Sequence, residues 1–194
     1  MPTFQESDLT FSFPHSWTVR KYDAHRFYQG LSGYGLKAVD FIILLPDGRL
    51  CLAEVKNYHP RQNEHGEDHP ITRKKAAKLA KSLARKYTDS LHAIRIIREF
   101  YQRKWYHRWG YFLYGRLGYW TDLQFWHEAA RRAEGQLPVT ILLWLETPKA
   151  AKRYRTKIYA HLHTHIAPEK AQLILGGNGF SPLVGLEAKF NSSV

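Results

Sequence analysis

The chain has 194 residues, of which 44% are hydrophobic and 24% charged, so it is long and apolar enough to bury the core of one globular domain. Its single cysteine, Cys51, excludes an internal disulfide and a cysteine-based zinc site. Its longest apolar runs have the length of strands and fall far short of the roughly 20 residues that cross a bilayer. Because no signal-peptide pattern is present either, the sequence predicts a cytoplasmic protein.

The charge balance is the first indication of a partner. Lysine and arginine total 29 against 17 acidic residues, which gives a net charge of +12. Such an excess of positive charge attracts polyanions, either nucleic acid or an anionic membrane. We favour nucleic acid and do not expect a membrane partner.

The first part of the chain predicts a hairpin that follows a helix. Residues 1–16 have the pattern of an irregular segment, and the apolar spacing after them indicates a helix over about Val19–Leu31. Two apolar runs, Val39–Leu45 and Leu50–Tyr58, are separated by the tetrapeptide Pro46–Arg49. This is the strongest hairpin signal in the sequence.

The middle of the chain predicts a loop and two helices. The polar stretch Asn57–Ile71 is unusually long for a loop within a domain. Thr72 is a suitable N-cap for a helix that ends near Tyr87, with a second helix beginning near Thr88. The outer face of the first of these helices is rich in lysine and arginine.

The rest of the chain predicts a helical insertion and then an alternation of strand and helix. The insertion covers about residues 88–135 and includes Phe100–Trp126, whose many aromatic side chains belong either to a core or interface or to a base-stacking surface. Its last helix is expected at about Asp122–Glu134. Residues 138–176 then form a strand, a helix and a strand, expected at Val139–Glu146, from Pro148 onward and at Ala171–Leu175.

The turn of the hairpin determines which side chains share a face. Pro46 suits the first central position of a type I turn, with Asp47 next and Gly48 in the left-handed conformation after it. This is a three-residue hairpin loop with a glycine bulge. In that register Asp40 lies opposite Glu54, so the two side chains point to the same face of the sheet.

Three charged residues in the otherwise apolar hairpin require a physical reason. Asp40 begins one strand, and Glu54 and Lys56 lie in the other. Burying a carboxylate is costly without a partner, and two adjacent carboxylates repel each other unless a divalent cation relieves the repulsion. A neighbouring lysine can then orient a water or stabilise negative charge that develops on a phosphate. The alternative is a structural ion pair between Glu54 and Lys56.

The pattern Asp40 followed by Glu54-Val55-Lys56 resembles the motif of the PD-(D/E)xK nuclease superfamily, including uncharacterised bacterial members. The resemblance covers a core motif region of about residues 22–87 and implies a restriction-endonuclease-like α/β fold, with a central mixed sheet flanked by helices on both faces and residues 1–194 forming one domain. It implies Mg²⁺ or Mn²⁺ bound by Asp40 and Glu54, with Lys56 serving the attacking water. The lesser candidates for the site are Asp23 and Lys37.

The implied activity is metal-dependent hydrolysis of phosphodiester bonds, in DNA rather than RNA. Three lysines of the basic helix are the candidate nucleic-acid contacts: Lys74, Lys78 and Lys81. The alternative is a catalytically inactive nucleic-acid-binding or assembly domain on the same scaffold. Because no separate recognition domain is visible, a second copy of the chain or a partner protein is expected to supply any specificity.

Overall fold

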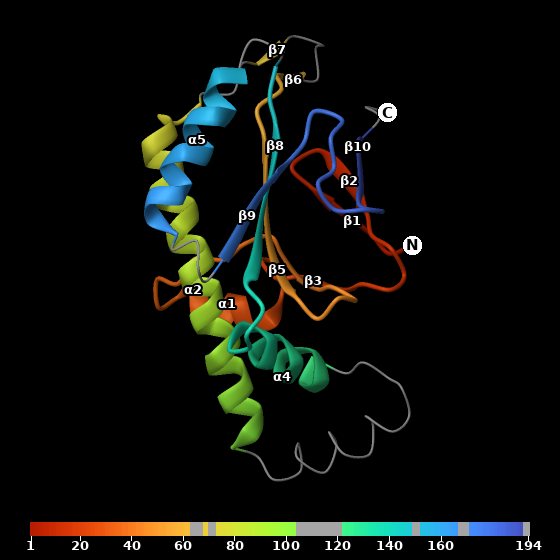
Figure 1. Ribbon diagram of the computed structural model, residues 1–194, viewed down its shortest axis with the longest axis vertical. Helices are drawn as coiled ribbons and strands as arrows, with labels where there is room; N and C mark the ends of the chain where they lie inside the picture. The colour runs from red at the N-terminus through yellow and green to blue at the C-terminus, as the bar shows by residue number, and fades with distance from the viewer. Residues whose placement is uncertain (63–67, 70–72, 104–121, 149–151, 167–170, 192–194) are drawn as a thin grey trace.

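The computed structural model describes residues 1–62, 68–69, 73–103, 122–148, 152–166 and 171–191. Within them, helices and two larger sheets form a mixed α/β protein (Figure 1). A separate pair of two-residue strands, β6 (Arg61–Gln62) and β7 (Asp68–His69), lies in the predicted polar loop. No helix of the described residues is long and apolar enough to cross a membrane.

A mixed sheet of five strands forms the centre of the molecule, in the order β3-β4-β5-β8-β9. The first three strands are antiparallel neighbours, whereas β8 runs parallel to β5 and β9 parallel to β8. Parallel neighbours need a crossover connection, which α2 provides before β8 and α5 before β9. The strands are β3 (Thr18–Lys21), β4 (Phe41–Leu44), β5 (Leu50–Asn57), β8 (Val139–Glu146) and β9 (Ala171–Gly176).

Helices cover one face of this sheet. Alternate side chains of the strands, such as Ile42, Leu52 and Leu143, share a buried cluster with apolar residues of the helices. Helices α2 and α5 run side by side along this face (Figure 1). The helices are α1 (Arg26–Ser32), α2 (Ala76–Gln102), α4 (Asp122–Ala133) and α5 (Lys152–His165).

A second sheet covers the other face, so the prediction of helices on both faces is wrong. Strands β1 (Thr3–Glu6), β2 (Leu9–Ser12) and β10 (Glu187–Phe190) form this antiparallel sheet. Leu9 and Phe11 alternate with polar neighbours and pack against the central sheet, in a cluster that includes Phe41, Val55 and Trp144. The first residues are therefore strands and not the predicted irregular segment.

Two predicted helices have different limits in the structure. Val19 pairs with Ile43 in the central sheet, so the segment predicted as one helix from Val19 is a strand, and only its later part is helical. The predicted break near Thr88 is absent, since α2 continues through it and the Thr88 hydroxyl bonds the Ala84 carbonyl one turn earlier. The cap of α2 is Lys75, not Thr72.

The later elements follow the prediction closely. Strand β8 has the predicted limits, β9 extends the predicted strand by one residue, and α4 ends one residue earlier than expected. Strand β10 lies beyond the last predicted strand. Most of the aromatic segment Phe100–Trp126, including residues 104–121, lies outside the described residues.

The hairpin between β4 and β5 has the predicted register. Gly48 has a φ of +89°, and its N–H bonds the Leu45 carbonyl, while the Leu45 N–H bonds the Arg49 carbonyl. From this glycine bulge the ladder continues with Leu44 opposite Leu50 and reaches Phe41 opposite Ala53. The regular ladder ends at that pair, and the Asp40 N–H bonds the Ala53 carbonyl, so the predicted pairing of Asp40 with Glu54 is not part of the ladder. Both residues lie at the end of the sheet that holds the candidate site.

Candidate active site

Glu54 is a carboxylate that the fold buries completely. It lies in β5 beside helix α2, with an exposed fraction of 0%. Its Oε1 is 2.6 Å from the Nζ of Lys56 and 2.6 Å from the Nζ of Lys86, which reaches it from α2. Its Oε2 is buried and has no hydrogen-bond partner among the described residues. One oxygen therefore pairs with two ammonium groups, and the other is buried without a hydrogen-bond partner among the described residues.

Asp40 lies immediately before β4, where the ladder of the hairpin becomes irregular. Its N–H bonds the carbonyl of Ala53, and its carboxylate Oδ2 accepts the N–H of Val55 at 2.7 Å. The residue is 6% exposed. Burial and the negative charge of Glu54 raise the pKa of Asp40 to about 7, although Lys56 and Lys86 act in the opposite direction. The free site therefore disfavours two ionised carboxylates side by side.

Lys56 interacts electrostatically with both carboxylates, Glu54 and Asp40. Burial lowers the pKa of this lysine, but the charges of Glu54 and Asp40 outweigh that effect and hold it above its ordinary value. The Nζ of Lys56 also bonds the Val55 carbonyl at 3.0 Å. The ammonium group is thus charged and held by two acceptors, and the Lys56 side chain is 30% exposed.

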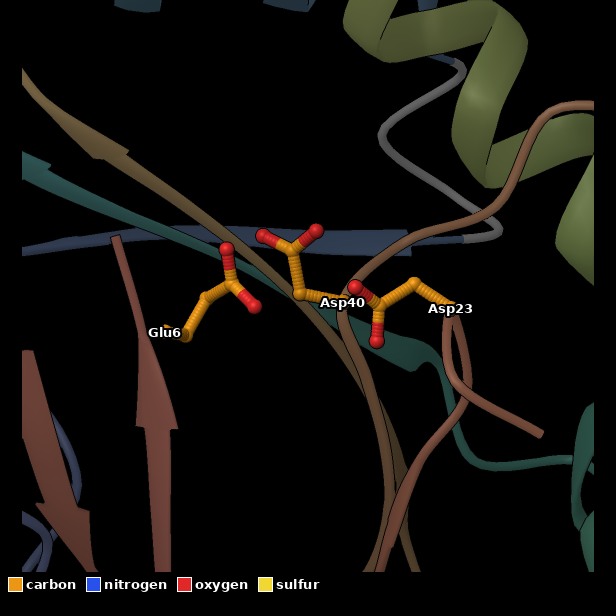
Figure 2. Close-up of side chains that lie close together, drawn as sticks. All are labelled: Glu6, Asp23 and Asp40. Carbon is orange, nitrogen blue, oxygen red and sulfur yellow. The ribbon is translucent and has the colours of Figure 1, made fainter. Parts of the chain in front are cut away.

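A second group of acids extends the site toward the N-terminal sheet. Glu6 of β1, Asp23 after β3 and Asp40 each offer a carboxylate oxygen within 4.8 Å of the others, and Figure 2 shows Asp40 between the other two. Lys21 pairs with Glu6 at 3.0 Å. Burial and the charge of Glu6 raise the pKa of Asp23, and its buried Oδ1 has no partner among the described residues.

These oxygens suit a hard divalent cation. Mg²⁺ and Mn²⁺ prefer carboxylate and water oxygens, and burial together with the charge of Glu54 raises the pKa of Asp40, which a bound cation would offset. Glu6, Asp23 and Asp40 can hold the ion, and Glu54, the other predicted metal ligand, is not part of this group. No cysteine or histidine is needed, as expected for such a metal.

The structure thus brings together Asp40, Glu54 and Lys56, which the motif indicated, and adds Asp23, a lesser candidate. Lys37 is exposed, and its described contact is a bond from its backbone N–H to Asp89. The lysines proposed to bind nucleic acid are exposed at the start of α2, away from the buried carboxylates: Lys74, Lys78 and Lys81.

Sequence reasoning missed Glu6 and Lys86. Glu6 belongs to a segment interpreted as irregular, and its place beside Asp40 depends on how the N-terminal sheet packs. Lys86 is one of many basic residues in α2, and only the packing of the helix selects it for contact with Glu54. No local signal in the sequence distinguishes either residue.

Comparisons with protein-family models, with curated proteins and with solved structures find no match for this chain.

Proposed function

We propose that the protein is a metal-dependent nuclease that hydrolyses phosphodiester bonds, in DNA rather than RNA. The observation that carries the proposal is the buried Glu54, which lies near Asp40. One of its oxygens is shared by two lysines, and the other has no hydrogen-bond partner among the described residues. A carboxylate kept in this state costs folding free energy, so its retention supports a role in chemistry.

The arrangement around the hairpin also supports the resemblance to the PD-(D/E)xK superfamily. Asp40 and the Glu54-Val55-Lys56 segment meet at one end of a mixed sheet, and the basic helix α2 follows them. The motif alone specifies residue types and spacing. The glycine bulge at Gly48 supplies the register that lets those residue types act together.

Each residue then has a chemical role. Glu6, Asp23 and Asp40 would hold Mg²⁺ or Mn²⁺. We extend the ligand set to the buried, unpartnered Oε2 of Glu54. When bound, such an ion lowers the pKa of a coordinated water and neutralises charge on a phosphate. The ammonium group of Lys56, held by Glu54 and still partly exposed, orients that water and stabilises negative charge that develops on the phosphate.

The direct test is incubation of the full chain with labelled single- and double-stranded DNA and RNA. Mg²⁺, Mn²⁺ or EDTA is added to parallel samples, and Asp40→Asn serves as the matched inactive variant. We expect cleavage of DNA that EDTA and the substitution both abolish. Cleavage by Asp40→Asn at the wild-type rate would indicate a contaminating nuclease and reject the assignment.

One observation favours a second function, a catalytically inactive nucleic-acid-binding or assembly domain. Lys56 and Lys86 already form ion pairs with Oε1 of Glu54, so this oxygen needs no metal to balance its charge. A domain of this kind would bind nucleic acid and show no cleavage with either metal. Binding that is unchanged by EDTA, without products in any sample, supports this alternative.

A further inference from the structure

The site contains more positive charge next to Glu54 than that carboxylate can neutralise. Lys56 and Lys86 share a single oxygen, Oε1, at 2.6 Å each. Their side chains remain 30% and 24% exposed, so both ammonium groups can also be approached from solvent. An ammonium group has three donors, so Lys86 keeps donors for an anionic ligand beyond the one that bonds Oε1 of Glu54. Because Lys56 is the lysine of the motif, Lys86 is the additional cation.

Lys86 lies at the end of a basic edge of helix α2. An α-helix turns about 100° per residue, so Lys75 and Ser82 lie within about 40° of Lys86 around the axis, and Lys78 within about 80°. Lys75, Lys78 and Ser82 are all exposed. At about 1.5 Å per residue, Lys75 is about 17 Å from Lys86 along the helix, the length of a few nucleotides.

The other basic residues of this part of α2 belong to a different face. Lys81 is about 140° from Lys86 around the helix axis, and Lys74 precedes the helix. Arg85 pairs with Asp89 at 3.4 Å, which reduces the positive charge that it offers to a ligand. Lys86, Ser82 and Lys75 therefore share one edge of the helix and Lys81 lies on another face, with Lys78 between them, about 80° from Lys86 and about 60° from Lys81.

We propose that a nucleic-acid backbone lies along this edge, with Lys86 binding the phosphate next to the acidic cluster and Lys78 and Lys75 binding phosphates farther along. The inference rests on the proposed function for the identity of the site. It replaces a binding surface spread over Lys74, Lys78 and Lys81 with a path that ends at the carboxylates. Lys86 is a positioning residue in this path, since it holds the substrate beside the reacting groups.

The test measures binding of the full chain to a fluorescein-labelled DNA strand and to the corresponding duplex in EDTA, so that no cleavage occurs. Lys86→Gln is compared with Lys81→Gln, a lysine-to-glutamine change on the other face of the same helix. We expect Lys86→Gln to weaken binding about tenfold and to reduce the slope of log affinity against log salt by about 1. Lys81→Gln keeps the wild-type slope, and Lys86→Arg restores it because the charge is retained.

A purely structural role for Lys86 gives a different result. If the lysine only neutralises Glu54, Lys86→Gln lowers the melting temperature but leaves the salt slope of the folded protein at the wild-type value. That outcome, an equal loss of slope in Lys81→Gln, or no binding by the wild-type chain overturns the inference.

The experiments also distinguish failure of the proposed function from failure of the binding path. If the wild-type chain cleaves no substrate with Mg²⁺ or Mn²⁺ while Lys86→Gln still loses its salt slope, the binding path stands and the nuclease assignment falls. If the chain cleaves DNA and Lys86→Gln retains both the wild-type KM and the wild-type slope, the nuclease assignment stands and the path falls. Under both proposals, Lys86→Gln raises KM more than it lowers kcat.

Discussion

Two glutamates are buried on neighbouring parallel strands, and their surroundings differ. Glu146, at the end of β8, is 4% exposed and accepts bonds on both oxygens, from the Trp144 ring N–H at 2.9 Å and the Asn178 N–H at 2.8 Å. Glu54, in the adjacent strand β5, is fully buried, with two lysines on one oxygen and no partner among the described residues for the other.

The difference shows how a structural carboxylate can be distinguished from a functional one. The donors to Glu146 are neutral groups of the surrounding fold, and they join the end of β8 to the turn after β9. The partners of Glu54 are long, flexible and partly exposed, so a ligand can displace or share them. Burial is common to both residues, and the oxygen of Glu54 without a hydrogen-bond partner among the described residues is what separates them.

Substitutions of Glu54 and Lys56 have the largest expected effect on the cleavage rate. We expect Glu54→Gln and Lys56→Ala each to lower the cleavage rate at least about 100-fold, because both remove charge that acts on the reacting phosphate. The rate of DNA cleavage in Mg²⁺ is the measurement, with circular dichroism to show that each variant is folded. A folded variant that cuts at the wild-type rate would remove Glu54 or Lys56 from the mechanism.

Metal binding should stabilise the protein through the acids around Asp40. A cation that binds only the folded state adds about 2.7 kcal/mol of stability at 100 times its dissociation constant. We expect Mn²⁺ or Mg²⁺ to raise the melting temperature and EDTA to reverse the rise. Asp23→Asn should weaken the response and Asp40→Asn should abolish it.

The matched control for metal binding is Glu146→Gln. Because Glu146 is outside the acidic cluster, this variant should retain the full increase in melting temperature with metal. An equal increase in wild type and Asp40→Asn would show that the ions bind elsewhere on the chain.

The sequence was sufficient for the hairpin and insufficient for the surroundings of the hairpin. Proline, aspartate and glycine in a row determine a turn by local sterics, and that turn sets the register of the ladder from Leu44 opposite Leu50 to Phe41 opposite Ala53. Glu6 and Lys86 reach the same site from a separate sheet and a separate helix. Their positions depend on tertiary packing, for which the local sequence carries no signal.

The second sheet shows why the fold was predicted only in part. Leu9 and Phe11 alternate with polar residues, which is typical of a strand with one buried face, but the strand is only four residues long. Its partner β10 lies almost at the other end of the chain. Strand β2 also forms a hairpin with β1 through Ser7 and Asp8, both with positive φ, but this turn contains no glycine or asparagine that would mark it in the sequence. A face covered by a sheet was therefore taken for one covered by helices.

Glu146→Gln should have the opposite profile to Glu54→Gln. The amide cannot accept from both Trp144 and Asn178, so one buried donor loses its partner at a cost of about 1–3 kcal/mol. We expect a lower midpoint in urea unfolding and an unchanged cleavage rate per folded molecule. A variant with normal stability and impaired cleavage would mean that Glu146 also serves the site, and the contrast between the two glutamates would fail.

Gly48→Ala should have the smallest effect, and it tests whether the turn alone holds the site together. With a φ of +89°, an alanine here is strained by about 1 kcal/mol, and the nearest atom to the added Cβ, Cδ1 of Leu137, is at an ordinary distance of 3.5 Å. The cost is therefore confined to the backbone. Because Asp40 is also fixed by its bonds to Ala53 and Val55, we expect slightly lower stability in urea and normal cleavage.

Gly48→Asn should lose less stability than Gly48→Ala, because asparagine tolerates the left-handed conformation better. Loss of cleavage in a folded Gly48→Ala would instead mean that the register can slip and carry Glu54 to the opposite face, where it would be no more available to a metal than Glu146 is.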